Sequence, residues 1–153
     1  MKVHDVMTEG VVSCSASANL AEVAQVMWEH DCGIVPIVND RGEAVGVLTD
    51  RDVAIALGTR GKCAAEVRAG DVMSTPVVGC APEDDIADVL ATMQRHRIRR
   101  LPVLGIGGVL LGLASLNDII THAPFPVTAD PIVSTLRAIG AHEHAIPVAV
   151  SVS

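Results

Sequence analysis

Apolar residues recur at the three- and four-residue intervals of a helix in two stretches of the chain. The first stretch is Leu20–Met27 and the second is Ile86–Met93, and the spacing in each predicts an amphipathic helix. Pro82–Asp85 precedes the second stretch, and proline followed by acidic side chains is favoured in the first turn of a helix. Both helices are therefore expected to bury one face against an apolar surface.

Short apolar runs, typical of strands, surround both helices. We expect strands at Gly10–Cys14, Ile34–Val38 and Ala44–Thr49 around the first helix, and at Pro76–Cys80, Leu101–Leu104 and Val109–Ser115 around the second. Turn residues at Asp40–Gly42 and Gly105–Gly108 predict a hairpin between the last two strands of each set. A further helix begins after each hairpin, at Asp50–Asp52 and at Asn117–Asp118.

The two sets of elements are copies of one unit. Asp5–Thr8 recurs as Asp71–Ser74, 66 positions later, and the same offset holds without a gap as far as Asp52 and Asp118. Such a short unit has too little core to be stable alone, so we expect the two copies to pack sheet against sheet about a pseudo-twofold axis. The expected organisation is repeat 1 at 1–58, a linker at 59–70, repeat 2 at 71–122 and a C-terminal tail at 123–153.

Composition narrows the classes of function. Half of the residues are hydrophobic and the mean hydropathy is +0.44, which excludes a disordered chain. Trp28 and Phe125 are the only aromatic side chains, so the stacking platform of single-stranded nucleic-acid binders is missing. The net charge of −7 also disfavours binding to a phosphate backbone. We therefore expect no nucleic-acid partner.

No part of the sequence predicts membrane association or secretion. Met1–Gly10 lacks the apolar core of a signal peptide, and Leu101–Leu116 is too short to span a bilayer and contains proline and glycines. The four cysteines (Cys14, Cys32, Cys63 and Cys80) are far apart in sequence and form no C-x-x-C pair. Reduced thiols in a cytoplasmic protein are the favoured interpretation, and mutual disulfides stay open as the alternative.

The sharpest local pattern is Gly46–Asp52 and its copy Gly112–Asp118. Each reads glycine, two apolar residues, Thr or Ser, two variable residues and Asp. The hydroxyl ends a strand and the carboxylate lies one turn later in a helix, so both face one spot. Free N–H groups at a helix start suit a phosphate, and a carboxylate can accept hydrogen bonds from ribose hydroxyls. The pattern thus predicts a ribose-phosphate site, with an ordinary helix cap as the alternative.

Four features of the sequence belong together: the phase of the repeat, the Asp-Val-Met-[Thr/Ser] segment, the strand with a central proline and the motif that ends in Asp. In this combination the sequence resembles a tandem pair of CBS domains, a Bateman module. The resemblance covers about residues 1–122. It implies an α+β fold of two βαββα repeats joined through their sheets, with a cleft on each side. It also implies a non-catalytic regulatory role: an adenine nucleotide (AMP or ATP foremost, or ADP, NAD or S-adenosylmethionine) binds in the clefts and regulates a separate partner protein. The family further implies a homodimer.

Carried over position by position, the resemblance assigns phosphate and ribose contacts to Thr49, Asp52, Ser115, Asp118, Arg99 and Arg100. The two arginines precede the proline-containing strand of repeat 2, where repeat 1 has Gly33 and Ile34. We therefore expect unequal sites, with the arginines beside Ser115 and Asp118 making that site the tighter one; a solvated basic face is the alternative. The adenine slots would be lined by Val11, Val12, Ile37 and Val47 in one site and by Val77, Val78, Val103 and Leu113 in the other, if these are not simply core residues.

Two other classes of function compete with nucleotide sensing. One is a structural or interaction dimer with empty clefts. The other is a metal or thiol sensor that uses His142 and His144, with His122, or Cys14 and Cys80. The histidines have no convincingly spaced third ligand, so no metal is expected, and no nucleophile elbow or Walker loop indicates an enzyme. In the tail, Asp130–Ile139 predicts a short helix, and Ala145–Val152 is a strand or a disordered end.

Overall fold

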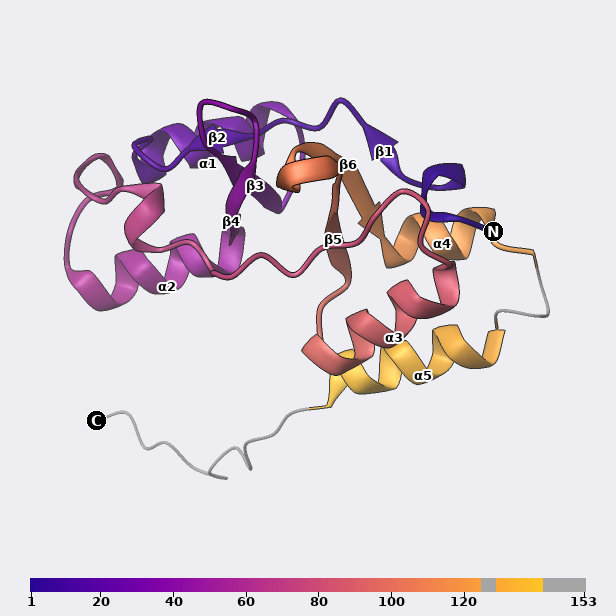
Figure 1. Ribbon diagram of the computed structural model, residues 1–153. Coiled ribbons are helices and arrows are strands. Elements are labelled where there is room, and N and C mark those ends of the chain that lie inside the picture. The colour runs from indigo at the N-terminus through magenta and orange to yellow at the C-terminus, as the bar shows by residue number, and fades with distance from the viewer. Residues whose placement is uncertain (125–128, 142–153) are drawn as a thin grey trace, which may run out of the picture.

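The computed structural model describes residues 1–124 and 129–141, and it has the expected α+β fold of two repeats (Figure 1). Repeat 1 contains β2 (Cys14–Ser15), α1 (Leu20–Glu29), β3 (Ile34–Val38), β4 (Ala44–Thr49) and α2 (Asp50–Arg60). Repeat 2 contains α3 (Ile86–His96), β5 (Arg100–Leu104), β6 (Leu110–Ser115) and α4 (Leu116–His122). The helices and hairpins predicted from periodicity and turn residues are therefore confirmed.

Each repeat has a three-stranded sheet. In repeat 1 the strand order is β2-β3-β4, with β2 parallel to β3 and β4 antiparallel to it. In the other sheet the order is β1-β6-β5, and its third strand is β1 (Thr8–Glu9), from the start of the chain. The sheets meet where Glu43 pairs with Val109. These two residues occupy equivalent positions of the repeat, so the expected pseudo-twofold axis passes between them.

The segment that leads into each repeat crosses to the sheet of the other repeat. Thr8 pairs with Leu113 of β6, and its counterpart Ser74 pairs with Val47 of β4, through backbone hydrogen bonds of 2.8 and 3.2 Å. Farther along, the chain returns to its own repeat, and Cys80 bridges Val103 of β5. The single strands predicted at Gly10–Cys14 and Pro76–Cys80 are wrong, because the chain passes from one sheet to the other within these segments.

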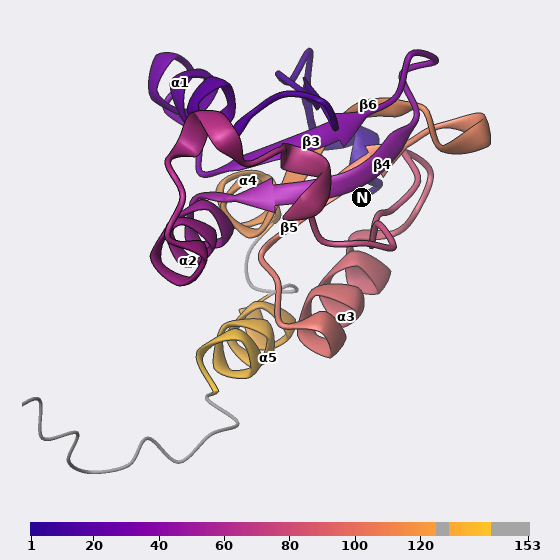
Figure 2. The ribbon, with the colours of Figure 1, turned by 90° about the vertical axis from the view of Figure 1, so that its left-hand side faces the viewer.

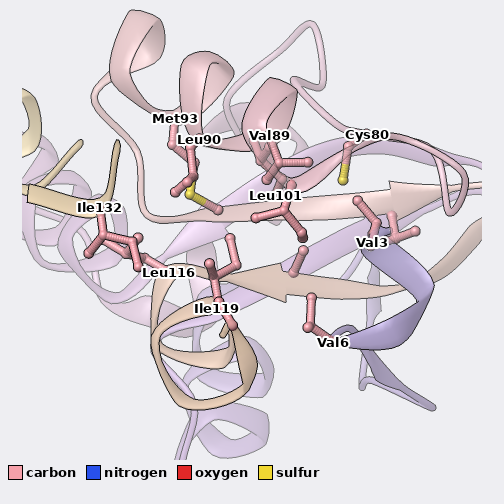
Figure 3. Close-up of a cluster of buried hydrophobic side chains, with 14 residues drawn as sticks. Val3, Val6, Cys80, Val89, Leu90, Met93, Leu101, Leu116, Ile119 and Ile132 are labelled. Carbon is pink, nitrogen blue, oxygen red and sulfur yellow. The ribbon is translucent and has the colours of Figure 1, made fainter. Parts of the chain in front are cut away.

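The crossing segments are built into the hydrophobic cores. Val3 and Val6, at the start of the chain, are buried in the core of repeat 2 beside Leu101 and Ile119 (Figure 3). Val67 and Ala69, which precede repeat 2, are buried in the core of repeat 1. Met27 and Met93 are buried in the cores, while Met7 and Met73 pack against the cores from the crossing segments.

Glycine is required where a crossing segment passes over a strand. A Cβ at Gly112 would collide with the carbonyl oxygen of Thr8, and a Cβ at Gly46 would collide with the side chain of Met73. These are the two glycines that open the repeated motif. Their role is to let the crossing segment approach the sheet, and ligand binding is not needed to explain them.

The tail adds a helix to repeat 2. Helix α5 (Ala129–Gly140) lies beside α3, as Figures 1 and 2 show, which confirms the helix predicted at Asp130–Ile139. The expected strand or disordered end at Ala145–Val152 lies outside the described residues, as do His142 and His144.

The close approach at Gly112 leads to a stability prediction. Gly112→Ala should lower the free energy of unfolding by about 1–3 kcal/mol, because the added methyl group overpacks the β1–β6 contact. Gly58→Ala is the matched control, since Gly58 lies in α2 with open space around it, and it should raise the stability by about 0.5–1 kcal/mol. Urea denaturation of both variants measures this, and equal stabilities would contradict the assigned role of Gly112.

Candidate functional site

The hydroxyl and carboxylate of each repeated motif contact one another. Thr49 Oγ1 donates to Asp52 Oδ2 at 2.8 Å, and the Asp52 N–H donates back to Thr49 Oγ1 at 3.2 Å. In repeat 2, Ser115 Oγ donates to Asp118 Oδ2 at 2.6 Å, and the Asp118 N–H donates back at 3.0 Å. The helix-cap alternative is therefore realised at both motifs. These side-chain bonds use Oδ2, and within the described residues no bond is found to Oδ1, which leaves that oxygen available to a ligand.

The start of α2 does not offer free amide groups for a phosphate. The Asp50 N–H donates to the carbonyl of Gly33 at 3.1 Å, and the Arg51 N–H donates to Asp50 Oδ1 at 2.8 Å. The Asp52 N–H is held by Thr49. An anion in this region must therefore be met by side chains rather than by the helix end expected from the sequence.

Two clefts lie at these motifs, and each is shared between the repeats. The Thr49 cleft has a volume of about 530 Å³ and joins Thr49 and Asp52 of repeat 1 to Val77, Val78 and the segment 96–100 of repeat 2. The Ser115 cleft, of about 360 Å³, joins Ser115 and Asp118 of repeat 2 to Val11, Val12 and the segment 30–34 of repeat 1. The clefts are pseudo-twofold copies, because their lining residues correspond under the offset of the repeat.

The grouping of the arginines expected from the sequence is wrong. Arg99 lines the Thr49 cleft and not the Ser115 cleft, and Arg100 lines both. The expectation placed both arginines with Ser115 and Asp118, because all four belong to repeat 2. The crossing segments, however, bring the end of α3 in one repeat to the motif of the other. The phosphate-binding candidates are thus concentrated at Thr49 and Asp52.

Six of the eight proposed adenine-slot residues line the clefts. Val47, Val77 and Val78 line the Thr49 cleft, and Val11, Val12 and Leu113 line the Ser115 cleft. Ile37 and Val103 do not: both are fully buried in the cores and line neither cleft. Side chains alternate along a strand, and these two share the core-facing side with Val35 and Leu101. The slot assignment is corrected at these positions. The expected grouping is also wrong for Val47 and Leu113, which have exchanged clefts, because each motif strand faces the segment of the other repeat.

The two clefts carry opposite charge. Arg51, Arg97, Arg99 and Arg100 line the Thr49 cleft against Asp50 and Asp52. Among the described residues, the Ser115 cleft has Glu9, Asp31 and Asp118 against Arg100 alone. Asp31 and Arg97 are equivalent residues that follow α1 and α3 in the left-handed conformation, with φ of 49° and 55°. One backbone geometry therefore presents an acid to one cleft and a base to the other.

Sequence reasoning missed several lining residues. Ser74 and Pro76 border the Thr49 cleft, as Thr8 and Gly10 border the Ser115 cleft. Thr8 and Ser74 match at the repeat offset, and this match could have identified both of them as lining residues. Ile139, from α5, also lines the Thr49 cleft; it lies outside the repeats, and no pattern in the sequence pointed to it.

The structure bears only on part of the alternative sensors, because His142 and His144 lie outside the described residues. Among residues 1–124 and 129–141, no three His, Cys, Asp or Glu side chains come together to hold a metal ion. All four cysteines are free thiols. Burial, reinforced by Asp84, raises the pKa of the Cys80 thiol to about 12, and burial also raises the pKa of Cys14. Both thiols thus resist ionisation, whereas a redox sensor requires a thiol that ionises readily to the thiolate.

The CBS domain family model matches residues 3–59 and 69–124. The chain therefore belongs to the CBS domain family, as a tandem CBS pair. It is 34% identical over 127 residues to an uncharacterised protein of Methanopyrus kandleri, a match that covers 83% of this chain and 65% of that protein. In the described part of the chain, no helix has the length and apolar character needed to cross a membrane.

Solved structures share the fold. Hypoxic response protein I, crystallised with two coordinated zinc ions, is 31% identical with a TM-score of 0.75, over 81% of this chain and 100% of that chain. Another CBS domain pair was crystallised in complex with 5′-methylthioadenosine and S-adenosyl-L-methionine. Its TM-score is 0.72 at 22% identity, over 79% of this chain and 94% of that chain, and at this identity the likeness is one of fold.

The thiol environments predict an order of chemical reactivity. Cys63 is exposed, whereas Cys80 is buried with a pKa near 12, so iodoacetamide at pH 8 should modify Cys63 and leave Cys80 unmodified. Because the thiolate reacts, the rate at Cys80 should rise about tenfold per pH unit up to its pKa, as long as the fold persists. Peptide mass spectrometry measures both rates. Fast modification of Cys80 at pH 8 would contradict its assigned environment and reopen the thiol-sensor alternative.

Proposed function

We propose that the protein is a non-catalytic regulatory module that binds an adenine nucleotide, AMP or ATP foremost, and passes the signal to a separate partner protein. The observation that carries the proposal is the Thr49 cleft. It combines a carboxylate with an open oxygen, several arginines and an apolar patch of Val47, Val77 and Val78. Its volume of about 530 Å³ is within the range of small-molecule sites.

The parts of a nucleotide have separate partners in this cleft. Asp52 Oδ1 is free to accept hydrogen bonds from the ribose hydroxyls, while Oδ2 stays in the helix cap. Arg99 and Arg100 supply the planar guanidinium groups that bind phosphate through paired hydrogen bonds. The valines offer an apolar slot for the base without aromatic stacking. This division replaces the helix-start phosphate site expected from the sequence.

The charge difference between the clefts supports a difference in ligand preference. The arginine-lined Thr49 cleft suits a polyphosphate, whereas three carboxylates in the Ser115 cleft oppose one. An adenosyl ligand without phosphates, such as S-adenosylmethionine with its positive sulfonium, is better matched to the Ser115 cleft. The tighter nucleotide site is thus the reverse of the one expected from the repeat order.

The assignment of the clefts is tested by a matched pair of substitutions. Asp52→Asn should weaken ATP binding about tenfold or more, because the amide loses the charged acceptor for the ribose, worth about 1.5–3 kcal/mol. Asp118→Asn makes the same change at the equivalent position of the Ser115 cleft and should leave the tight ATP affinity within about twofold. Isothermal titration calorimetry on both variants, after a melting curve verifies folding, measures this. The opposite ranking would overturn the assignment, and a wild-type protein that binds no adenine nucleotide would favour a structural dimer with empty clefts.

We also propose a homodimer, on a different observation. Trp28 on α1 is 84% exposed and Ile55 on α2 is 50% exposed, although both are large and apolar. The residue equivalent to Trp28 in repeat 2 is Gln94, which is polar and covered by α5. Sedimentation at micromolar concentration should give twice the mass of one chain, and Trp28→Asp should shift it toward monomer. Ile106→Asp, at a fully exposed hairpin position, is the control; a wild-type monomer would contradict the proposal.

A further inference from the structure

Helix α5 lies beyond the residues that match the CBS family, yet it is part of the core of repeat 2. Ile132 is buried beside the α3 residues Leu90 and Met93, and Ile139 packs against the same core from the last turn of α5. Figure 3 shows Ile132 pointing toward the other side chains of this core. Helix α5 is therefore a docked element with a defined inner face.

Polar contacts from Gln94 fix the position of α5 on α3. Thr135 is fully buried, and its Oγ1 accepts a hydrogen bond of 2.9 Å from Gln94 Nε2. The same hydroxyl donates to the carbonyl of Pro131 at 2.7 Å, so the buried group is satisfied in both roles. Gln94 is two residues before His96, where α3 reaches the Thr49 cleft. The contact thus joins α5 to the part of α3 that lines the cleft.

The last turn of α5 reaches the cleft itself. Ile139 lines the Thr49 cleft together with His96, Ile98 and the arginines, and Ile98 packs against the same core as Ile139. A ligand that fills this cleft therefore meets a wall formed partly by α5. If α5 left α3, this wall would be lost and the inner face of α5, with Ile132 and Ile139, would meet water.

We propose that α5 is the element that reports occupancy of the Thr49 cleft. A ligand that contacts Ile139 binds the α5-docked state more tightly than the undocked state, so binding must favour docking and docking must favour binding to the same degree. The signal available to a partner protein is then the exposure or concealment of the inner face of α5. This proposal rests on the proposed function, because it requires an adenine nucleotide in the Thr49 cleft.

The test compares two apolar residues of the same helix. Ile139→Ala removes the side chain in the cleft wall, and Leu136→Ala removes an exposed side chain one turn earlier. Ile139→Ala should weaken ATP binding about five- to tenfold, as expected for the lost burial of one or two methylene groups. Leu136→Ala should bind within about twofold of the wild type. ATP should also slow hydrogen–deuterium exchange of the amides of residues 129–140 in the wild-type protein.

A second variant acts without touching the cleft. Gln94→Ala removes the hydrogen bond to Thr135 and should both speed amide exchange in α5 and lower the ATP affinity, by about threefold or more. Melting curves verify that all variants are folded. If the wild type binds none of ATP, AMP and S-adenosylmethionine, the proposed function fails and the role of α5 fails with it. If ATP binds but all variants bind equally and exchange in α5 is unchanged, the proposed function stands and the role of α5 is overturned.

Discussion

The rest of the structure depends on one constraint, which is that each of the two crossing segments pairs with the sheet of the other repeat. Neither sheet has its second antiparallel contact without the other repeat: Thr8 completes the sheet of repeat 2 and Ser74 extends the sheet of repeat 1. The same segments bury Val3 and Val67 in the opposite cores. The crossing segments thus contribute both backbone hydrogen bonds and buried apolar side chains to the opposite repeat. The pseudo-twofold arrangement is therefore stabilised by residues shared between the cores, in addition to the contacts between the surfaces of the two repeats.

The composition of the clefts follows from this crossing. Each crossing segment passes the Gly-to-Asp motif of the other repeat before it returns to its own repeat. The carboxylate of one repeat therefore shares a cleft with apolar residues and a helix end of the other repeat. Duplication makes the two clefts similar in shape. Substitutions at single equivalent positions, such as Asp31 against Arg97 and Gly33 against Arg99, then give them different charge without a change in the backbone. Two clefts of different charge thus coexist on one scaffold.

Much of the fold could be predicted from the sequence, because helices, hairpins and the repeat depend on local spacing. The α1 and α3 periodicity, the capped starts of α2 and α4 and the tail helix were all readable in that way. The partner of a two-residue strand such as β1 is set by contacts far away in sequence, and it leaves no periodic signal. Arg99 was therefore assigned to the wrong motif, Ile37 and Val103 were placed in a slot rather than the core, and Ile139 was not found.

The crossing also means that the stretch of chain that builds one complete sheet and core does not coincide with the stretch that repeats in the sequence. The structural unit is shifted along the chain relative to the sequence repeat. A fragment of residues 10–75 carries β2, β3, β4 and the segment that closes its own sheet. A fragment cut at the end of α2 keeps Val3 and Val6, which belong to the other core, and lacks Val67 and Ala69, which belong to its own. Truncation at the visible boundary of the duplication would therefore leave two pieces, each of which lacks core residues and a strand contact that the other piece carries.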